Sequence, residues 1–404
     1  MTHDIEAIAA AGLCAGCGLC AALAPAGTIE MHDSIDGYRR PRLVRPLPQR
    51  EATLIDAVCP GLNIVHTPDE IDANYHPVWG PIIASRLGWS TDPALRRNAS
   101  SGGGLSAMLI YLLEIGEIDY VLQTSVSEHS PIRNAIRIST GRDDVFASAG
   151  SRYAPSSPLA NIDQLLDRPA RFAFVGKPCD VAGLRMLSRH DPRVDEKVRF
   201  LFAFMCAGVP SHHGTDAVLS AMGVEDGAEI ESFRFRGDGW PGNATAVLTD
   251  GRRFAMDYNT SWGTILNRHL QFRCKICPDG TGEFADITFA DGWHCDERGY
   301  PSFQETKGRS LILTRTQRGE ALFTRAQAAG HAASEPIVVD VIRFIQPFQA
   351  KRKGLVLSRL AAMASIGRIR PRFRRLALVR NTIRLGFSEN IRSFLGTLRR
   401  LRHS

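Results

Sequence analysis

The sequence predicts an α/β fold with some α+β elements, in which a mixed sheet forms the core. Apolar runs of strand character alternate with helical patterns from about residue 80 onward. A loop-rich segment with four cysteines precedes this alternation, and an arginine-rich segment follows it. Because alternating strands and helices build sheets that are at least partly parallel, we expect three parts: residues 1–75, 76–340 and 341–404.

The elements of the predicted core follow one another in a regular rhythm. Residues 80–89 are typical of a strand, residues 104–116 carry apolar side chains at helical spacing, and residues 118–126 predict the next strand. Residues 171–189 and 198–223 each join an apolar run, a turn with Gly or Pro, and a helix. Residues 230–305 have a stronger β pattern. The rhythm indicates strands joined by crossover helices.

Length and composition are those of an ordinary globular protein. The chain has 404 residues, of which 44% are hydrophobic and 23% charged. Its apolar runs at 105–116 and 200–210 are shorter than the roughly 18 residues that a membrane-spanning helix needs. The first residues lack the pattern of a signal peptide. We therefore expect a cytoplasmic protein, either free or peripheral at the inner face of the membrane.

The formal net charge of +7 hides a strong asymmetry. From Arg343 onward the chain has 16 Lys and Arg and one acidic residue, which leaves 33 basic and 41 acidic residues elsewhere. We expect two or three Arg-rich amphipathic helices in this tail, interrupted at Gly354, Gly367, Pro371 and Gly386.

The basic tail also predicts a partner. Its densest stretch is Arg370, Arg372, Arg374 and Arg375 around Phe373. Such a stretch can meet a membrane surface, an acidic ferredoxin or nucleic acid. A basic helix that is merely solvated explains the pattern equally well.

Three cysteines at intervals of three, Cys14, Cys17 and Cys20, form the most specific motif. They match the first three ligands of a bacterial ferredoxin run, in which a further cysteine precedes a proline. Cys59 stands directly before Pro60 and is the expected fourth ligand. We expect a 4Fe–4S cluster here. Zinc is the alternative, but zinc modules usually present two separated CxxC pairs.

A second set of four cysteines is predicted from the core. Cys179 and Cys206 each follow a predicted strand, and Cys274 and Cys277 form a CxxC pair. Loops at one edge of a parallel sheet converge, so these thiols are expected to form a second four-thiolate site. The alternative interpretation makes Cys206 a small buried hydrophobic residue. Cys295 is left over, and we expect a free thiol.

Two clusters imply one-electron transfer, whereas organic substrates usually take two electrons and a proton, and a flavin commonly links the two. A glycine-rich turn before a predicted helix is the candidate phosphate-binding element, because helix N–H groups and the helix dipole favour phosphate. The turn comprises Ser100, Ser101, Gly102, Gly103 and Gly104. A plain turn is the alternative, since the pattern matches no nucleotide-binding motif.

Two further features are candidates for the flavin site. A second polar loop contributes Ser151, Arg152, Tyr153 and Ser156. Lys177, two residues before Cys179, offers a cation for a reduced flavin, or else is a solvated loop lysine.

Other polar residues have two interpretations each. His212, beside His213, is a candidate proton donor to substrate, or else a residue of a helix's first turn without chemistry. Arg234 and Arg236 lie on one face of a predicted strand, either to bind an acidic substrate or as an exposed sheet face. Asp286 and Asp291 bracket another strand, with structural or flavin-adjacent roles.

Together these motifs resemble the coenzyme F420 hydrogenase/dehydrogenase beta-subunit family. The resembling segments fall in order over residues 10–365: CAGCGLC, CPG, SSGGGLSAMLIYLLEIGEIDYVL, GSRYAPSSPL, FVGKPCDVAGLR, FMCAGVPS, FRCKICPDGTGEFADITFADGW and QAKRKGLVLSRLAAM. Family members are flavin- and iron–sulfur-containing oxidoreductases, including ferredoxin-dependent reductases of chlorophyll intermediates. The resemblance implies a flavin-binding core with FAD at the two polar loops near Lys177, a ferredoxin-like N-terminal segment, and 4Fe–4S clusters at both cysteine sets.

The expected function is that of a flavin and iron–sulfur oxidoreductase. Ferredoxin or a similar donor would supply electrons at the first cysteine set, and these would pass through the second set to FAD and reach an organic substrate as hydride. One alternative is a non-catalytic electron-transfer subunit docked on a larger enzyme by the basic tail. Others are reduction of coenzyme F420 itself and, ranked last, nucleic-acid binding. An oligomer is compatible with the sequence.

Overall fold

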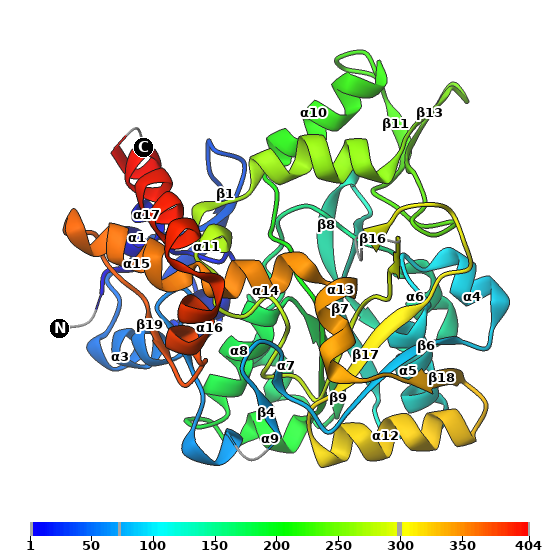
Figure 1. The fold of residues 1–404 in the computed structure, drawn as a ribbon, viewed down its shortest axis with the longest axis horizontal. Helices are drawn as coiled ribbons and strands as arrows, with labels where there is room; N and C mark the ends of the chain where they lie inside the picture. Colours follow the sequence, from blue (N-terminus) through cyan, green and yellow to red (C-terminus); the bar gives the residue numbers. More distant parts are fainter. Residues whose placement is uncertain (1–2, 72–73, 297–300, 403–404) are drawn as a thin grey trace.

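The computed structural model describes residues 3–71, 74–296 and 301–402. Its centre is an eight-stranded mixed sheet of order β18-β6-β17-β14-β10-β9-β7-β8 (Figure 1). Its strands are β6 (Ala84–Ser90), β7 (Tyr120–Ser127), β8 (Ser130–Ser139), β9 (Phe172–Gly176), β10 (Val198–Phe204), β14 (Ile287–Asp291), β17 (Ser310–Thr314) and β18 (Ala332–Pro336). The α/β class and the mixed sheet expected from the sequence are confirmed.

The four central strands run parallel. β7 pairs with β9, β9 with β10 and β10 with β14 in this way, while β8, β17, β6 and β18 add antiparallel strands on either side. The carboxyl ends of the parallel strands therefore meet at one edge, which we call the carboxyl edge. Because β17 is antiparallel, its first residue, Ser310, pairs with the last residue of β14, Asp291, at this edge.

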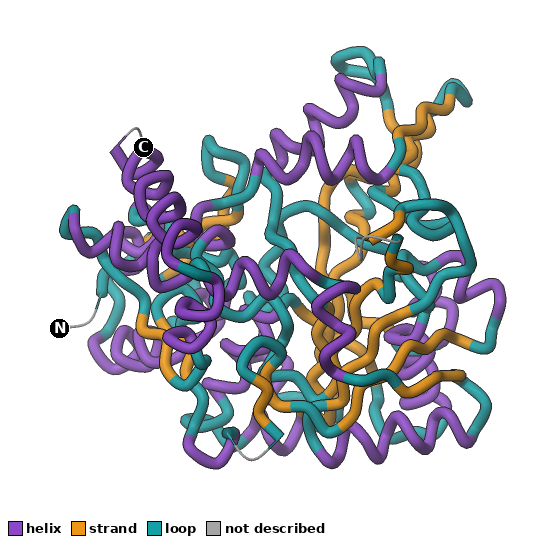
Figure 2. Tube along the Cα trace, viewed as in Figure 1, coloured by secondary structure: helices purple, strands orange, loops and turns teal. Residues whose placement is uncertain are grey.

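Helices cover both faces of the sheet, and Figure 2 shows the strands gathered between them. On one face, Val121, Ala173 and Phe202 pack with α5 (Gly104–Glu114) and α12 (Gln317–Ala328). On the other, Phe172 and Phe174 pack with α7 (Ile162–Leu166), α8 (Pro178–Leu187) and α9 (Arg193–Lys197). Burial on both faces explains why these strands are nearly continuous apolar runs.

A smaller antiparallel sheet confirms the β pattern expected from residue 230 as far as residue 256, but helical elements replace it over residues 259–275. The sheet consists of β11 (Ile230–Arg234), β12 (Ala244–Leu248) and β13 (Arg253–Met256), and it packs with α10 (His212–Met222). Further short elements are α4 (Pro93–Asn98), α6 (Arg142–Ala147), α11 (Phe272–Lys275), β4 (Tyr75–His76), β5 (Gly80–Pro81), β15 (His294–Cys295), β16 (Pro301–Ser302), the π-helix Asn259–Ile265 and the 3-10 helices Pro68–Glu70, Leu266–His269 and Val339–Val341.

The N-terminal segment is mostly loop with short elements. These are α1 (Ile5–Ala10), α2 (Leu19–Leu23), the hairpin β1 (Ile29–Asp33) and β2 (Arg39–Leu43), α3 (Gln49–Val58) and β3 (Asn63–Val65). The C-terminal helices lie beside this segment at the left of Figure 1. Ile8, Leu13, Ile276, Met363 and Leu401 share one buried cluster, so the three predicted parts pack against one another.

The C-terminal tail has more elements than predicted. It forms α13 (Ile342–Ile345), α14 (Pro347–Gly354), α15 (Val356–Ser365), β19 (Arg372–Arg374), α16 (Leu378–Leu385) and α17 (Phe387–Arg402). The expected interruptions at Gly354, Gly367, Pro371 and Gly386 all fall at the ends of elements or in the loops between them. A basic helix at the Arg370–Arg375 stretch is wrong, because β19 pairs with β3 in parallel and extends the backbone there.

The described ranges contain no helix that is both long enough and apolar enough to span a membrane.

Candidate functional site

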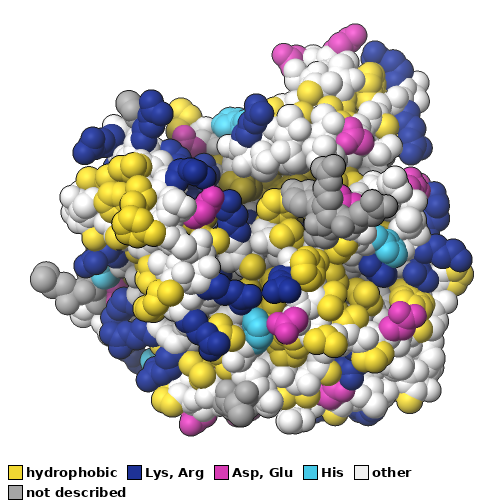
Figure 3. All heavy atoms as spheres, viewed as in Figure 1, with side chains coloured by type: hydrophobic (Ala, Val, Ile, Leu, Met, Phe, Trp, Pro, Cys, Tyr) yellow, Lys and Arg dark blue, Asp and Glu magenta, His cyan; other side chains and the backbone are white. Residues whose placement is uncertain are grey.

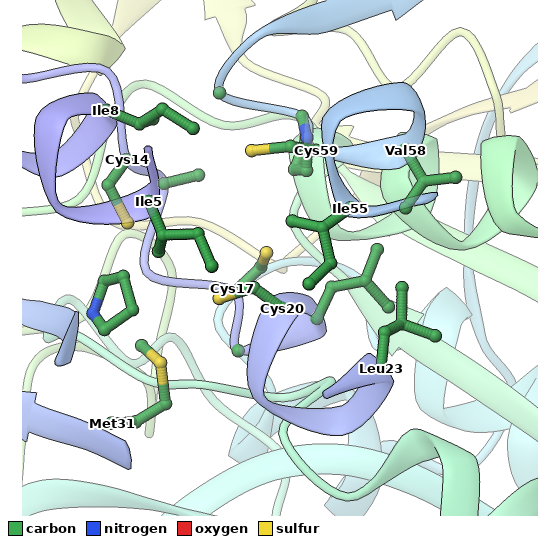
Figure 4. A pocket seen from close by; sticks show the side chains of 16 residues that line it. Ile5, Ile8, Cys14, Cys17, Cys20, Leu23, Met31, Ile55, Val58 and Cys59 are labelled. Atoms are coloured by element: carbon green, nitrogen blue, oxygen red, sulfur yellow. The ribbon is translucent and has the colours of Figure 1, made fainter. Parts of the chain in front are cut away.

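The first cysteine set lines one pocket. Cys14, Cys17, Cys20 and Cys59 surround it, and in Figure 4 their sulfur atoms point toward a common space. The apolar side chains of Ile5, Ile8, Leu23, Ile55 and Val58 enclose the same space. The structure thus brings together the four thiols that the ferredoxin-like spacing predicts, although Cys59 lies far from the other three in the sequence.

Glycines shape the backbone of this pocket. Gly16 and Gly18 have φ values of 76° and 84°, in the left-handed region that favours glycine. A Cβ on Gly18 would meet the backbone of Ala160 at 2.8 Å. The turns at these glycines let Cys14, Cys17 and Cys20 face one side.

The second cysteine set gathers at the carboxyl edge of the sheet. Cys179 lies in the first turn of α8 just after β9, and Cys206 follows the neighbouring strand β10. Cys274 belongs to α11 and Cys277 follows that helix. Cys274 and Cys277 lie close enough to Cys206 for their charges to act on its thiol. Cys277 is also close enough to act on the thiol of Cys179. The expected convergence of strand-end cysteines is therefore found.

Burial makes four of the thiols, those of Cys17, Cys59, Cys179 and Cys206, hard to ionise without a compensating cation. It raises the pKa of Cys59 to about 11 and that of Cys206 to about 12. Burial also raises the pKa values of Cys17 and Cys179. A metal group supplies the positive charge that buried thiolates need, because binding deprotonates its thiol ligands.

Within the described ranges, no three His, Cys, Asp or Glu side chains are close enough together to hold one metal ion. A four-iron cluster takes one thiolate on each of its irons, so it needs thiols arranged around it rather than gathered on one atom.

Lys177 and Asp180 form a buried ion pair between the two cysteine sets. Nζ of Lys177 lies 2.6 Å from Oδ2 of Asp180, and the charge of Asp180 acts on both Cys17 and Cys179. Burial alone would lower the pKa of Lys177, but Asp180 raises it above its ordinary value. The interpretation of Lys177 as a solvated loop lysine is wrong, because Lys177 is buried and paired.

Arg273 also lies between the sets, and sequence reasoning missed it. Its side chain is 2% exposed, and Nη2 donates a hydrogen bond to the carbonyl oxygen of Pro60 at 2.7 Å. Its charge acts on Cys59 of the first set and Cys277 of the second. In the part of the chain that the structure describes, Nε and Nη1 of Arg273 have no hydrogen-bond partner. The arginine directly before Cys274 is the only sequence signal for this placement.

The glycine turn, residues 100–104, also lies at the carboxyl edge. Ser101 Oγ donates to a backbone carbonyl at the end of β14 or the start of β17, with Ala290 O and Arg309 O both at 3.2 Å. A Cβ on Gly102 would meet Gly88 O at 2.6 Å and the backbone nitrogen of Ser310 at 2.7 Å. Close packing on the sheet edge therefore explains the glycine there.

The turn opens onto the N-terminus of α5. Gly103 has a φ of 73° and is the residue before the helix, and no side chain of the described residues caps its first N–H groups. Uncapped N–H groups at a helix N-terminus are available to an anion such as phosphate.

The polar loop, residues 150–161, joins the glycine turn to the first cysteine set. At one end, the backbone N–H of Ser151 donates to Ser100 Oγ at 2.6 Å. At the other, the backbone N–H of Leu159 donates to the carbonyl oxygen of Cys17 at 2.9 Å. Ser156 lies half-buried between these ends. The two loops predicted to hold a flavin are thus neighbours.

Two further contacts fix the end of the polar loop on the cysteine-bearing turn. Ser157 Oγ donates a hydrogen bond to the carbonyl oxygen of Gly16 at 2.9 Å. Ala160 packs so closely on Gly18 that no side chain fits between them. A change at the polar loop is therefore expected to reach the first cysteine set.

Arg152 and Tyr153 serve different partners. The guanidinium of Arg152 donates to Asn134 Oδ1 and to three backbone carbonyl oxygens, those of Pro131, Arg133 and Phe233. These bonds hold β8 and β11 together, so Arg152 has a structural role in this arrangement. Tyr153 contacts the ring of Trp262, at 4.6 Å between centroids.

His212 lies at the start of α10, against the N-terminal hairpin. Its Nε2 is 3.2 Å from Oδ1 of Asp33, and its backbone N–H donates to Gly37 O at 2.9 Å. Burial, followed by the charge of Arg133, lowers the pKa of His212. Nδ1 is buried and has no partner among the described residues. The structure therefore assigns His212 a contact between α10 and the hairpin, and its role as a proton donor stays a prediction.

Arg236 and Asp291 form a buried pair at the carboxyl edge. Nη1 and Nη2 of Arg236 lie 2.8 and 3.0 Å from the two carboxylate oxygens of Asp291, and Trp240 Nε1 donates to the same carboxylate at 2.7 Å. Trp240 stacks on Trp293 at 4.8 Å. Arg234 donates hydrogen bonds to Asn98, just before the glycine turn. An exposed sheet face is therefore wrong for this pair of arginines.

Asp286 lies at the opposite end of β14 from Asp291. It is fully buried, and both of its oxygens accept hydrogen bonds from Arg318, at 2.6 and 2.7 Å. The backbone N–H of Leu201 donates to it as well. This environment gives Asp286 a structural role and separates it from the glycine turn.

Comparison with known proteins identifies the family. The model for the N-terminal part of the coenzyme F420 hydrogenase/dehydrogenase beta subunit matches residues 86–162, and the model for its C-terminal part matches residues 170–339. Together they cover more than half of the chain. The chain belongs to the coenzyme F420 hydrogenase/dehydrogenase beta-subunit family.

Several curated proteins resemble this family member over most of its length. It is 23% identical over 336 residues to the coenzyme F420-dependent sulfite reductase of Methanocaldococcus jannaschii, covering 79% of this chain and 46% of that protein. It is 21% identical over 299 residues to the coenzyme F420 hydrogenase subunit beta of Methanothermobacter thermautotrophicus, covering 71% of this chain and 95% of that one. The chain thus spans less than half of the sulfite reductase.

The fold of the family is also seen in a solved structure. A chain of the F420-reducing [NiFe] hydrogenase complex from Methanosarcina barkeri matches with a TM-score of 0.57 and 18% identity, over 73% of this chain and 97% of that one. The curated relatives are named as oxidoreductases or as subunits of them, and the structural match shows the shared fold.

The family models begin after the first cysteine set and end before the basic tail, since they match residues 86–162 and 170–339. Cys14, Cys17, Cys20 and Cys59 therefore lie outside the matched ranges, whereas the second set and the glycine turn lie inside them.

Proposed function

We propose that this chain is a flavin- and iron–sulfur-dependent electron-transfer oxidoreductase. The two cysteine sets would each hold a 4Fe–4S cluster, and the glycine turn with the polar loop would hold FAD. Clusters supply one-electron steps, and a flavin supplies the change between one-electron and two-electron transfer. The observation that carries the proposal is the gathering of eight cysteines, all buried or half-buried, into two sets.

The donor sets fit clusters in their chemistry. All eight ligands would be thiolates, which iron–sulfur clusters take from proteins. The start of α8 adds a helix N-terminus beside Cys179, where the positive end of the helix dipole favours a thiolate. Arg273 adds a buried positive charge near both sets, whereas the charge of Lys177 is balanced by Asp180. The charge of Arg273 offsets part of the cost of holding anionic thiolates away from water.

The flavin proposal rests on the carboxyl edge of the sheet. α/β folds bind ligands beyond the carboxyl ends of their parallel strands, and the second cysteine set, Asp291 and the glycine turn all lie at this edge. The uncapped N-terminus of α5 would bind a phosphate of FAD. Ser100 and Ser151, which are hydrogen-bonded to each other, would line the same site.

Ferredoxin or a similar donor is the proposed source of electrons, and an organic molecule is the proposed acceptor of a hydride. Entry at the first set is favoured because Cys14, Cys17 and Cys20 have the spacing of a ferredoxin run. Lys177 and His212 remain the proposed catalytic groups, with Lys177 also beside the cofactor.

Two further candidates are a non-catalytic electron-transfer beta subunit of a larger dehydrogenase or reductase complex, and reduction of coenzyme F420 itself. The names of the relatives favour them, because they include subunits of F420 hydrogenase and F420H2 dehydrogenase. In either case we propose that the basic C-terminal helices dock the chain onto a partner protein or a membrane surface.

An anaerobic reductive titration of the purified chain, followed by visible absorbance, tests the proposal. Two clusters and one FAD accept about four electrons per chain. A chain that takes up fewer than two electrons, or that releases no flavin on denaturation, contradicts it. Steady turnover of the isolated chain with artificial electron donors favours the enzyme over the non-catalytic subunit.

A further inference from the structure

The last two helices carry an exposed apolar face. On α16 and α17, large hydrophobic side chains recur every four residues, which places those of each helix on one side. They are Val379, Ile383, Phe387, Ile391 and Leu395, which are 65%, 75%, 82%, 42% and 57% exposed. We call these five residues the apolar stripe. A stripe of this size on a folded surface marks an interaction site.

The other sides of both helices are fixed to the molecule. Asn381 Nδ2 of α16 donates to the carbonyl oxygen of Pro77 at 2.8 Å. In α17, Ser393 Oγ accepts a hydrogen bond from Arg359 Nε of α15 at 3.1 Å, and Leu401 is buried. The stripe is therefore held outward by helices whose polar and apolar inner contacts are already made.

Positive charge flanks the stripe. Arg380, Arg384, Arg392 and Arg399 are exposed on the same two helices. Glu389, which is the one acidic residue of the tail, is paired with Lys351 at 3.2 Å and with Arg392 at 3.0 Å. In Figure 3, hydrophobic side chains gather on the side where the C-terminal helices lie, with Lys and Arg around them.

A groove of about 630 Å³ continues the stripe at α16. Its apolar lining includes Leu357, Phe373, Leu376 and Leu378, together with Val379 and Ile383 of the stripe. Arg375 and Arg380 also line it. The groove thus combines an apolar lining with two guanidinium groups, which matches the acyl chain and the anionic headgroup of a lipid.

We propose that α16 and α17 bind the surface of a membrane that contains anionic phospholipids. The apolar stripe would enter the boundary between headgroups and acyl chains, and the flanking arginines would contact phosphates. The charge of the face is complementary to such a surface, and its stripe contains only Val, Ile, Phe and Leu. Protein interfaces are instead enriched in Tyr, Trp and Met as well as Phe and Arg. This inference rests on the proposed docking role of the helices and not on the cofactors.

Flotation of the full-length chain with lipid vesicles tests the inference. We expect the chain to float with phosphatidylcholine vesicles that contain phosphatidylglycerol, and to bind vesicles of pure phosphatidylcholine at least about tenfold more weakly. Added salt should release part of the bound protein, because screening weakens the contacts of the arginines. Equal binding to both vesicle types, or binding to neither, overturns the inference.

Two double variants with matched controls locate the contact. Ile383→Ser with Phe387→Ser removes apolar groups from the stripe, and Arg380→Glu with Arg384→Glu reverses charge beside it. Each is expected to weaken binding to anionic vesicles more than about tenfold. Ile35→Ser, at a 94% exposed position in the β1–β2 turn, and Arg253→Glu, on β13, should leave binding unchanged.

The competing occupants of the stripe give different results. If light scattering shows a dimer that the Ile383/Phe387 variant converts to a monomer, the face binds a second copy and the inference is wrong. Full vesicle binding by both double variants also contradicts it. The cluster and flavin contents of each variant, measured on the same samples, separate a failure of lipid binding from a failure of the proposed redox function.

Discussion

Arg273 has two buried nitrogen atoms, Nε and Nη1, without a hydrogen-bond partner in the described ranges, and its charge reaches Cys59 and Cys277. If the proposed clusters are bound, these atoms would be available to donate to cluster sulfur atoms. In Arg273→Gln we expect lower reduction potentials at both centres, because one positive charge and its charged hydrogen bonds are lost. A loss of about 1.5 kcal/mol corresponds to roughly 60 mV for a one-electron couple.

Redox titration followed by electron paramagnetic resonance measures this shift. Arg253→Gln, at an exposed position on β13, is the control, because Arg253 lies outside the segments that carry the cysteine sets. Unchanged potentials in a fully loaded Arg273→Gln variant would show that Arg273 only supports packing.

Lys177 and Asp180 give a second prediction at the same scale. Lys177→Ala leaves the carboxylate of Asp180 buried without its cation, and removing one partner of a buried pair costs about 3–5 kcal/mol. We expect a drop of this order in the free energy of unfolding, measured by urea denaturation. Lys307→Ala, at an exposed position, should change it little. If Lys177→Ala loses only flavin or activity and keeps its stability, the ion pair matters less than a direct cofactor contact.

At the scale of elements, the glycine turn depends on close packing at the sheet edge. A methyl group on Gly102 would overlap Gly88 O and the backbone nitrogen of Ser310. We expect Gly102→Ala to lower stability by about 1–3 kcal/mol and to reduce the flavin content. Gly141→Ala is the control, because nothing lies within 4 Å of a Cβ there and its φ is an ordinary extended value. Flavin release on denaturation and thermal unfolding measure both effects, and equal behaviour of the two variants would contradict the assigned role.

Sequence reasoning reaches the elements whose signals are local or follow from sheet geometry. The strand-end positions of Cys179 and Cys206 predict their convergence, because parallel strands share a carboxyl edge. Arg152 cannot be assigned in this way, since its partners come from β8 and β11, far apart in the sequence. The extended form of the Arg372–Arg374 stretch is hidden for the same reason: its pairing with β3 is a contact between the two ends of the chain.

At the scale of the whole molecule, Glu283 joins all three parts of the chain. Its carboxylate contacts Lys353 Nζ at 2.5 Å, Tyr75 Oη at 2.8 Å and His66 Nε2 at 3.2 Å. Burial alone would raise the pKa of Glu283, but Lys353 and His66 lower this pKa to about 2. A carboxylate with a lowered pKa stabilises the fold above its unfolded pKa of about 4.3, and this stability is lost as pH falls toward 2.

We therefore expect the melting temperature to fall between pH values of about 4.3 and 2. Glu283→Gln should be less stable at neutral pH, because Lys353 stays buried without its partner, and should show a smaller loss on acidification. Thermal melts of both proteins across this range test the junction. If the melting temperature falls equally with acid in the wild type and the variant, protonation of Glu283 does not cause the loss of stability.

The central claim is that the two cysteine sets hold two iron–sulfur clusters. The most direct measurement is the iron and acid-labile sulfide content of the anaerobically purified chain. We predict about eight of each per chain, and about four in Cys14→Ser and in Cys179→Ser, since each variant breaks one set. Cys295→Ser, at an exposed thiol outside both sets, should keep about eight. A colourless protein that contains zinc and no sulfide would contradict the claim.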